Sequence, residues 1–71
     1  MNIICVDLVM DDGNLVRIEC PRKYEDELHD TMSAAMKRRD AWSPRQWDGC
    51  TAEYLGHRLE TVNMARVIGR M

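Results

Sequence analysis

Phenylalanine is absent from this chain of 71 residues, and its aromatic residues are only two tryptophans and two tyrosines. A small core built from so few aromatic residues needs at least one of the tryptophans. Glycine and proline are also scarce, with four and two residues, which excludes a collagen-like or low-complexity chain. The longest uncharged apolar run spans residues 1–6, whereas a membrane helix needs about 20 residues. With no secretory signal visible, we expect a single cytoplasmic domain over residues 1–71 that makes no membrane contact.

Sequence motifs of catalysis and cofactor binding are missing as well. The four glycines are isolated from one another, so no phosphate-binding loop is present. Cys50 and His57 lie seven residues apart with nothing nearby in the sequence to assist a nucleophile. The carboxylates of residues 25–27 fall on successive faces of a helix and do not form an acid–base pair. We therefore expect a protein that is not an enzyme and takes neither a cofactor nor a small-molecule substrate.

Cysteine is present only as Cys5, Cys20 and Cys50, an odd number without a C-x-x-C spacing. At least one of them has no partner within the chain. In the absence of a secretory signal, we expect reduced thiols that pack as small hydrophobic residues. Neither histidine is spaced from the cysteines as zinc ligands usually are, so no metal site is expected.

Charge is divided unevenly between the two parts of the chain. Residues 1–30 carry eight acidic and three basic side chains, a net charge of −5, and residues 31–71 carry a net charge of +3. The total of −2 argues against a general polyanion binder.

Alternating apolar residues predict a β-hairpin formed by residues 2–10 and 15–20. A two-residue loop at residues 12–13 would mix apolar and charged side chains on one face. A three-residue loop, Asp12-Gly13-Asn14, keeps one face apolar, and both Gly13 and Asn14 tolerate a positive φ. This register pairs Met10 with Val16, Leu8 with Ile18, and Val6 with Cys20.

A helix is predicted from residue 22 to about residue 41, directly after Pro21. Acidic residues near its start and basic residues near its end complement the helix dipole. Its narrow apolar stripe, which ends on a long arginine side chain, consists of Tyr24, Leu28, Met32, Ala35, Met36 and Arg39.

The last third of the chain allows two interpretations. Residues 51–55 and 58–62 can pair as strands, with a loop at 56–58 that sets Leu55 against Leu59 and Ala52 against Val62. The same residues also fit an amphipathic helix interrupted by a glycine. Before them, residues 43–46 read as a capped helical turn or as a linker. We expect an α+β fold of two hairpins around one helix (ββαββ), with a helical C-terminal third as the alternative.

The most distinctive segment places basic residues among tryptophans within residues 37–47. Arginine and tryptophan contribute much of the binding energy at protein interfaces. Cations and aromatic rings together also hold phosphates and stack on bases. In a third interpretation the cations complement the helix dipole and the rings fill the core. The candidate protein-binding residues are Lys37, Arg38, Arg39, Trp42, Arg45 and Trp47.

The N-terminal hairpin provides a second candidate surface, which is largely acidic. Its charges can dock on a basic partner, or they can keep an edge strand soluble and unpaired. If the first strand lies at an edge, a partner strand can add to it. The residues of this second surface are Asp7, Asp11, Asp12, Arg17 and Glu19.

In overall style the chain resembles the small single-domain proteins that bacteriophages encode to redirect host machinery. The resemblance rests on the hairpin–helix–hairpin pattern, the missing catalytic motifs, the divided charge and the segment 37–47. Members of that group bind host RNA polymerase, its σ factor, nucleases or CRISPR effectors, and act by occupying a surface. The resemblance implies a binding protein of the host cytosol that inhibits or retargets a bacterial protein complex, RNA polymerase first among them. Alternatives are a nucleic-acid-binding regulator that uses residues 37–47 and a virion or assembly component.

Overall fold

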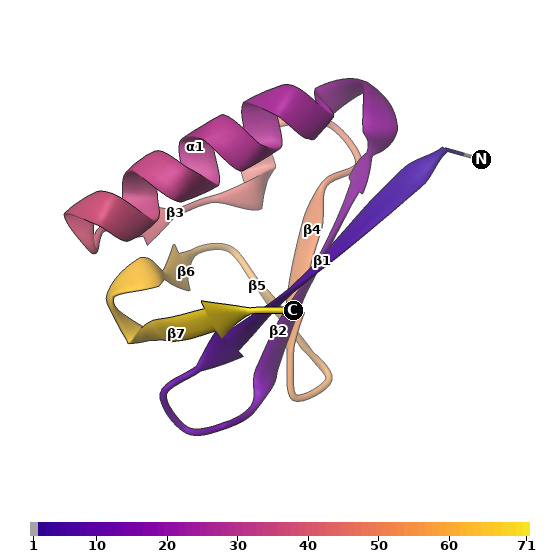
Figure 1. The fold of residues 1–71 in the computed structure, drawn as a ribbon. Coiled ribbons are helices and arrows are strands. Elements are labelled where there is room, and N and C mark those ends of the chain that lie inside the picture. The colour runs from indigo at the N-terminus through magenta and orange to yellow at the C-terminus, as the bar shows by residue number, and fades with distance from the viewer. Residues whose placement is uncertain (1) are drawn as a thin grey trace.

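The first two strands lie near the centre of a five-stranded antiparallel sheet in the computed structural model, which describes residues 2–71 (Figure 1). The strands are arranged across this sheet in the order β5-β4-β2-β1-β7. Their bounds are Ile3–Met10 for β1, Leu15–Pro21 for β2, Thr51–Tyr54 for β4, His57–Leu59 for β5 and Val67–Arg70 for β7.

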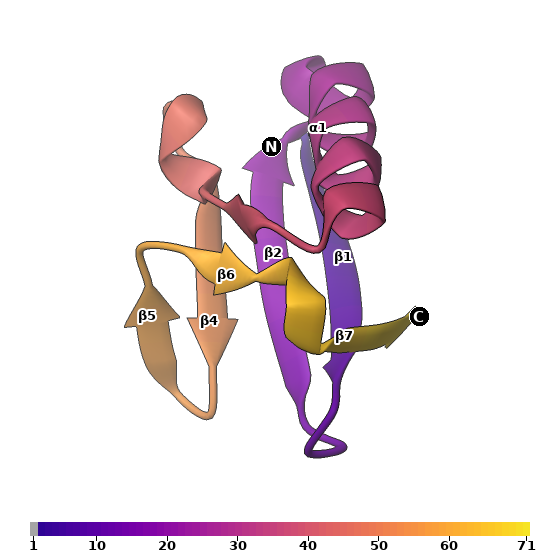
Figure 2. The same cartoon turned by 90° about the vertical axis from the view of Figure 1, so that its left-hand side faces the viewer.

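One helix, α1 (Glu25–Arg38), covers one face of this sheet and leaves the other face open (Figure 1). A second sheet of two short strands, β3 (Ala41–Trp42) and β6 (Val62–Asn63), lies on the same side as α1 (Figure 2). Three single turns of 3-10 helix complete the described chain, η1 at Arg22–Tyr24, η2 at Pro44–Gln46 and η3 at Met64–Arg66. The predicted α+β class and the predicted N-terminal hairpin and central helix are therefore confirmed.

The core lies between α1 and the covered face of the sheet. Every second residue of β1 and β2 points toward α1 and is buried, as the alternation predicts. Leu28, Met32 and Ala35 of the apolar stripe are the buried residues of α1. Burial of each large apolar side chain stabilises the fold by about 1.5–3 kcal/mol, so this contact holds the two layers together.

The helical segment ends earlier than predicted. It begins with η1 at Arg22, but α1 stops at Arg38, because Arg39 adopts a left-handed conformation with φ of +54°. The backbone N–H of Asp40 then bonds back to the carbonyl of Ala35 at 2.9 Å. Ala41 leaves the helix and pairs with Asn63 in the small sheet.

The loop of the N-terminal hairpin has the predicted length of three residues, but its predicted register is wrong by two positions. The loop is Asp11-Asp12-Gly13, and the observed pairs are Leu8–Val16, Val6–Ile18 and Ile4–Cys20. The last position of such a loop needs a positive φ, and Gly13 takes it at +83°. A shift of two residues leaves every side chain on its predicted face.

The C-terminal third forms strands, so the helical alternative is wrong. The turn between β4 and β5 is also shorter than the predicted loop at 56–58, because Leu55 and Gly56 alone make it, at φ of +51° and +79°. Two positive φ values match the twist of the flanking strands. The resulting register sets Ala52 opposite Leu59 and the acidic Glu53 opposite Arg58.

Strand β7 was not predicted from the sequence. It returns to the N-terminal hairpin and pairs with β1, with a register shift between Val9 and Met10.

The residues before β4 form the capped turn, since the Ser43 hydroxyl accepts a hydrogen bond from the Arg45 N–H at 3.2 Å. The linker interpretation of residues 43–46 is therefore wrong.

Replacing Leu55 by asparagine is expected to raise the free energy of unfolding by about 1 kcal/mol. Asparagine adopts the left-handed conformation at lower cost than leucine, and the leucine is 61% exposed, so little packing is lost. Urea denaturation measures the difference. As a matched control, Gly56→Ala should lower the same free energy by about 1 kcal/mol. A Cβ added at this position would meet no atom within 4 Å, but alanine would be strained at the positive φ of Gly56. A destabilised Leu55→Asn variant would contradict this account of the turn.

Candidate functional site

Both tryptophans of the candidate segment lie in the core. Trp42 is 3% exposed and Trp47 is 9% exposed, and their ring centroids are 6.0 Å apart. The indole N–H of Trp42 donates to the Thr31 hydroxyl at 3.0 Å, and that of Trp47 donates to the Glu27 carboxylate at 2.9 Å. Both acceptors belong to α1 and satisfy the polar atoms of the buried rings. Rings held in this way cannot stack on nucleic-acid bases or enter a partner surface.

The four cations of the same segment are exposed, but the structure divides them between two places. Lys37 and Arg38 lie at the end of α1, followed by Arg39, whose guanidinium donates to the carbonyl of Ala65 at 2.8 Å. Arg45 lies in η2 and forms an ion pair with Glu60 at 3.2 Å. The predicted Arg/Trp cluster is thus reduced to a basic helix end and one separate arginine.

Two charges of the second candidate surface, Asp7 and Arg17, belong to a row of alternating charge across the open face. Asp7 and Arg17 face each other in the β1–β2 register and lie 3.1 Å apart. Arg17 is also opposite Glu53, which is in turn opposite Arg58. Hydrogen bonding and charge attraction from Asp7 raise the pKa of Arg17. This row of alternating charge across four strands is electrically neutral and makes the open face of the sheet polar.

The acidic tip of the hairpin is held by Arg66 of η3. The Arg66 guanidinium lies 2.9 Å from Asp11 and 3.4 Å from Asp12. The pKa of Asp12 is lowered first by the hydrogen bond from the Asn14 backbone N–H, with Arg66 acting in the same direction. Glu19, the remaining residue of this surface, stands between Cys5 and Thr51 on neighbouring strands. Sequence reasoning missed Arg66 because it lies more than fifty positions from its partners.

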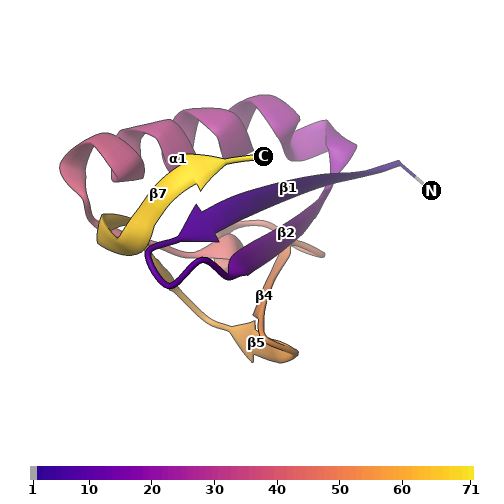
Figure 3. The ribbon, with the colours of Figure 1, turned by 60° about the horizontal axis from the view of Figure 1, so that its bottom comes forward.

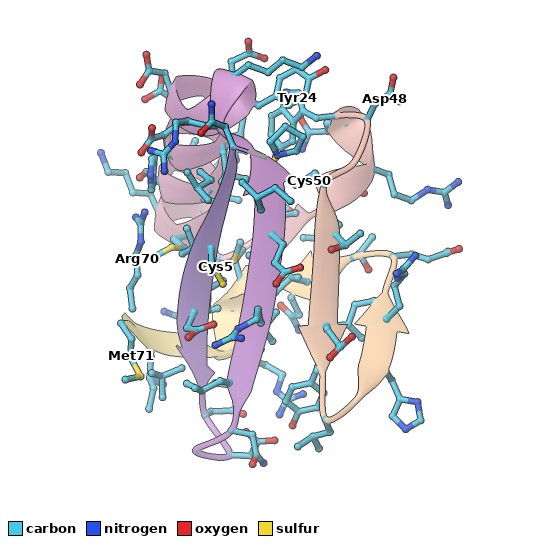
Figure 4. The ribbon with its side chains drawn as sticks, turned by 90° about the vertical axis from the view of Figure 1, so that its right-hand side faces the viewer. Cys5, Tyr24, Asp48, Cys50, Arg70 and Met71 are labelled. Atoms are coloured by element: carbon cyan, nitrogen blue, oxygen red, sulfur yellow. The ribbon has the colours of Figure 1, made fainter. Side chains whose placement is uncertain are left out.

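A groove that the sequence did not identify lies along the edge of β1, where a partner strand was expected to be able to add. Strand β7 covers only Leu8–Met10, and β1 runs on past the end of β7 (Figure 3). Within residues 2–71, no strand pairs with Ile3–Val6 on that side. A groove of about 380 Å³ lies beside this open half, and its lining residues are Ile3, Ile4, Cys5, Val6, Arg22, Glu25, His29, Arg70 and Met71. Figure 4 shows Arg70 extending from β7 toward α1 along this edge, with Cys5 on the neighbouring strand.

The three cysteines differ in their surroundings. Cys20 and Cys50 are buried. Cys20 follows Glu19 in β2, and Cys50 directly precedes Thr51, the β4 residue that pairs with Glu19. Burial, together with a hydrogen bond to Cys20, raises the pKa of the Cys50 thiol far above its usual range. Cys5 is exposed on the open face, yet local desolvation also raises the pKa of its thiol. A raised pKa disfavours the thiolate, so neither Cys5 nor Cys50 is activated as a nucleophile.

Comparisons with protein-family models, with curated proteins and with solved structures find no match to this chain. No helix in the described part of the chain combines the length and apolar character that a membrane span requires. Within residues 2–71, no three or more His, Cys, Asp or Glu side chains are placed together so that they could hold a metal ion.

Replacing Thr31 by valine is expected to lower the free energy of unfolding by about 1–3 kcal/mol. Valine keeps the shape of threonine but leaves the buried indole N–H of Trp42 without an acceptor. Urea denaturation followed by tryptophan fluorescence measures the loss. Thr31→Ser retains the hydroxyl and should lose much less, so equal losses in the two variants would show that the hydrogen bond contributes nothing.

One thiol is expected to react in the native protein and three after denaturation. The reactive thiol is that of Cys5, because Cys20 and Cys50 are buried. Since the pKa of Cys5 is raised above its usual value of 9.0, its rate of alkylation should still be increasing above pH 9. Mass spectrometry after timed labelling identifies the site. The Cys5→Ser variant should show no fast reaction, and fast labelling of Cys50 would contradict the structure.

Proposed function

We propose that this chain is a non-enzymatic binding protein that inhibits or retargets a large bacterial complex by occupying the surface of one subunit. The observation that carries the proposal is the open half of β1 at Ile3–Val6, which lies beside a groove. An exposed strand edge supplies affinity through main-chain hydrogen bonds to a partner strand. Natural sheets usually cover or block such edges, so an open one is a natural candidate for contact.

Bacterial RNA polymerase is the first partner to test. This choice rests on the resemblance to host-takeover proteins, which act by surface occupation. The burial of Trp42 and Trp47 moves the proposed contact away from residues 37–47. It moves toward the edge of β1 in the N-terminal hairpin, where a partner strand can add.

A nucleic-acid-binding regulator is the second candidate, favoured by the exposed basic end of α1. Lys37 and Arg38 lie there side by side in the sequence, with Arg39 directly after them. With both indole rings buried, such a contact would be made to phosphates rather than to bases. Its affinity would then fall steeply with salt.

Binding to purified RNA polymerase distinguishes the two candidates. If the proposal is correct, the chain forms a stoichiometric complex that survives nuclease and moderate salt and that lowers transcription in vitro. Lys37→Glu should leave this complex unchanged, because the lysine lies outside the β1 edge. The matched control is Lys23→Glu, the other lysine of the chain.

A nucleic-acid contact would give the opposite pattern. Lys37→Glu would then weaken binding while Lys23→Glu would not, and nuclease treatment would abolish capture. Absence of a complex with the core enzyme and with the σ-bound enzyme would exclude RNA polymerase as the partner.

A further inference from the structure

The backbone of the open half of β1 is oriented for pairing. Alternate residues of an antiparallel strand direct their N–H and C=O groups to opposite sides. On the β2 side, the carbonyl of Asn2 accepts from the Arg22 N–H, and the Met10 N–H donates to the carbonyl of Asn14, both at 2.9 Å. Even-numbered residues of β1 therefore bond to β2. Odd-numbered residues face the other side, where the carbonyl of Asp7 accepts from the Met71 N–H at 2.9 Å.

Ile3 and Cys5 are the next odd-numbered residues along this edge. Their backbone donors and acceptors point into the groove beyond the end of β7. Both residues are exposed, and Ile3 is 48% exposed. A strand added at this position would continue the line of β7 and extend the sheet. Two residues on one edge offer up to four main-chain hydrogen bonds.

The wall of the groove toward α1 has a positive net charge. The Arg22 guanidinium lies 3.6 Å from the Glu25 carboxylate, and His29 Nε2 lies 3.9 Å from the same group. Arg70 contacts His29 Nδ1, so its partner is an imidazole ring and not a carboxylate. This wall therefore carries two guanidinium groups and one carboxylate, and only Arg22 is paired with that carboxylate. A carboxylate entering the groove would be a stronger acceptor for Arg70 than the imidazole is.

We propose that this groove binds an extended acidic peptide segment of a protein partner, which adds as a strand along Ile3–Val6 and places a carboxylate between Arg22 and Arg70. Side chains of an added strand alternate between the two faces of the sheet. Side chains of the added strand on the covered face would lie beside Ile4 and Val6, next to the groove wall that carries Arg22 and Arg70. The segment therefore alternates an acidic or apolar residue that faces α1 with a residue that faces solvent. This inference rests on the proposed binding function and specifies its mode.

A labelled peptide that alternates valine and glutamate tests the inference by fluorescence anisotropy. Cys5→Pro removes the outward N–H while leaving the bonds to β2 intact, and proline is tolerated at such an edge position. We expect binding to weaken about tenfold in this variant. Cys5→Ser keeps the N–H and should bind as the wild type does. In the wild type, amide exchange at Ile3 and Cys5 should slow when the peptide is added.

Charge is tested with matched arginine variants. Arg70→Gln and Arg22→Gln should each weaken binding about threefold to tenfold. Arg58→Gln, on the far edge strand, should have no effect. A peptide with lysine in place of glutamate should not bind.

Several outcomes would overturn the inference. Equal binding by Cys5→Pro excludes strand addition, and equal binding of the lysine peptide excludes the acidic partner. Self-association that Cys5→Pro abolishes would assign the edge to a second copy of the chain. If Cys5→Pro binds RNA polymerase as well as the wild type does, the proposed function is supported and strand addition in this groove is excluded. If the peptide binds as expected but no complex with RNA polymerase forms, peptide binding in the groove is supported and RNA polymerase is excluded as the partner.

Discussion

The packing of α1 on the covered face of the β1–β2 hairpin is the contact on which the rest of the structure depends. A chain of this length has few apolar side chains to bury, and it contains no phenylalanine. The two indole rings supply the missing volume. Each brings a buried N–H that needs an acceptor, and Thr31 and Glu27 of α1 provide one each. The helix therefore satisfies the polar atoms of the same core that it covers.

Contacts of arginine side chains join other parts of the fold to one another. Ion pairs of Arg66 attach η3 to the hairpin tip, and an ion pair of Arg45 attaches η2 to the segment before β6. The Arg39 guanidinium attaches the end of α1 to η3 by a hydrogen bond to a backbone carbonyl. Each of these exposed contacts contributes little by itself. Their consequence for function is larger, because an arginine with an internal partner is less free to bind another molecule. Eight of the ten basic residues are arginines, and these three of them are engaged in internal contacts of the fold.

Local patterns in the sequence were sufficient for the N-terminal hairpin and the helix. For residues 51–55 and 58–62 they favoured strands but left a helix as the alternative. They were insufficient for register, because a shift of two residues preserves every buried side chain. The pairing of β7 with β1 could not be predicted from so short a segment, since strands this short depend on tertiary contacts for their stability. The same limit applies to the candidate site. A tryptophan next to arginines in the sequence is compatible with a core position and with an interface position. The structure shows that both rings are in the core, where Thr31 and Glu27 of α1 accept their N–H groups. Arg70 and His29 are forty-one residues apart, and neither belongs to a pattern that would have linked them.

Strand β7 pairs with only part of β1 because of the end from which it approaches that strand. The chain arrives from η3, which Arg66 holds against the hairpin tip, so pairing must start at Met10 and proceed toward Ile3. The register shift between Val9 and Met10 uses one residue of β7 without advancing along β1. The paired residues of β7 therefore reach only Leu8, and one further hydrogen bond joins the Met71 N–H to the Asp7 carbonyl. The Arg70 side chain then turns to His29 on α1 and leaves the remaining edge beside a cationic wall. The attachment that stabilises the hairpin tip is thus also what leaves the opposite end of β1 open to a partner.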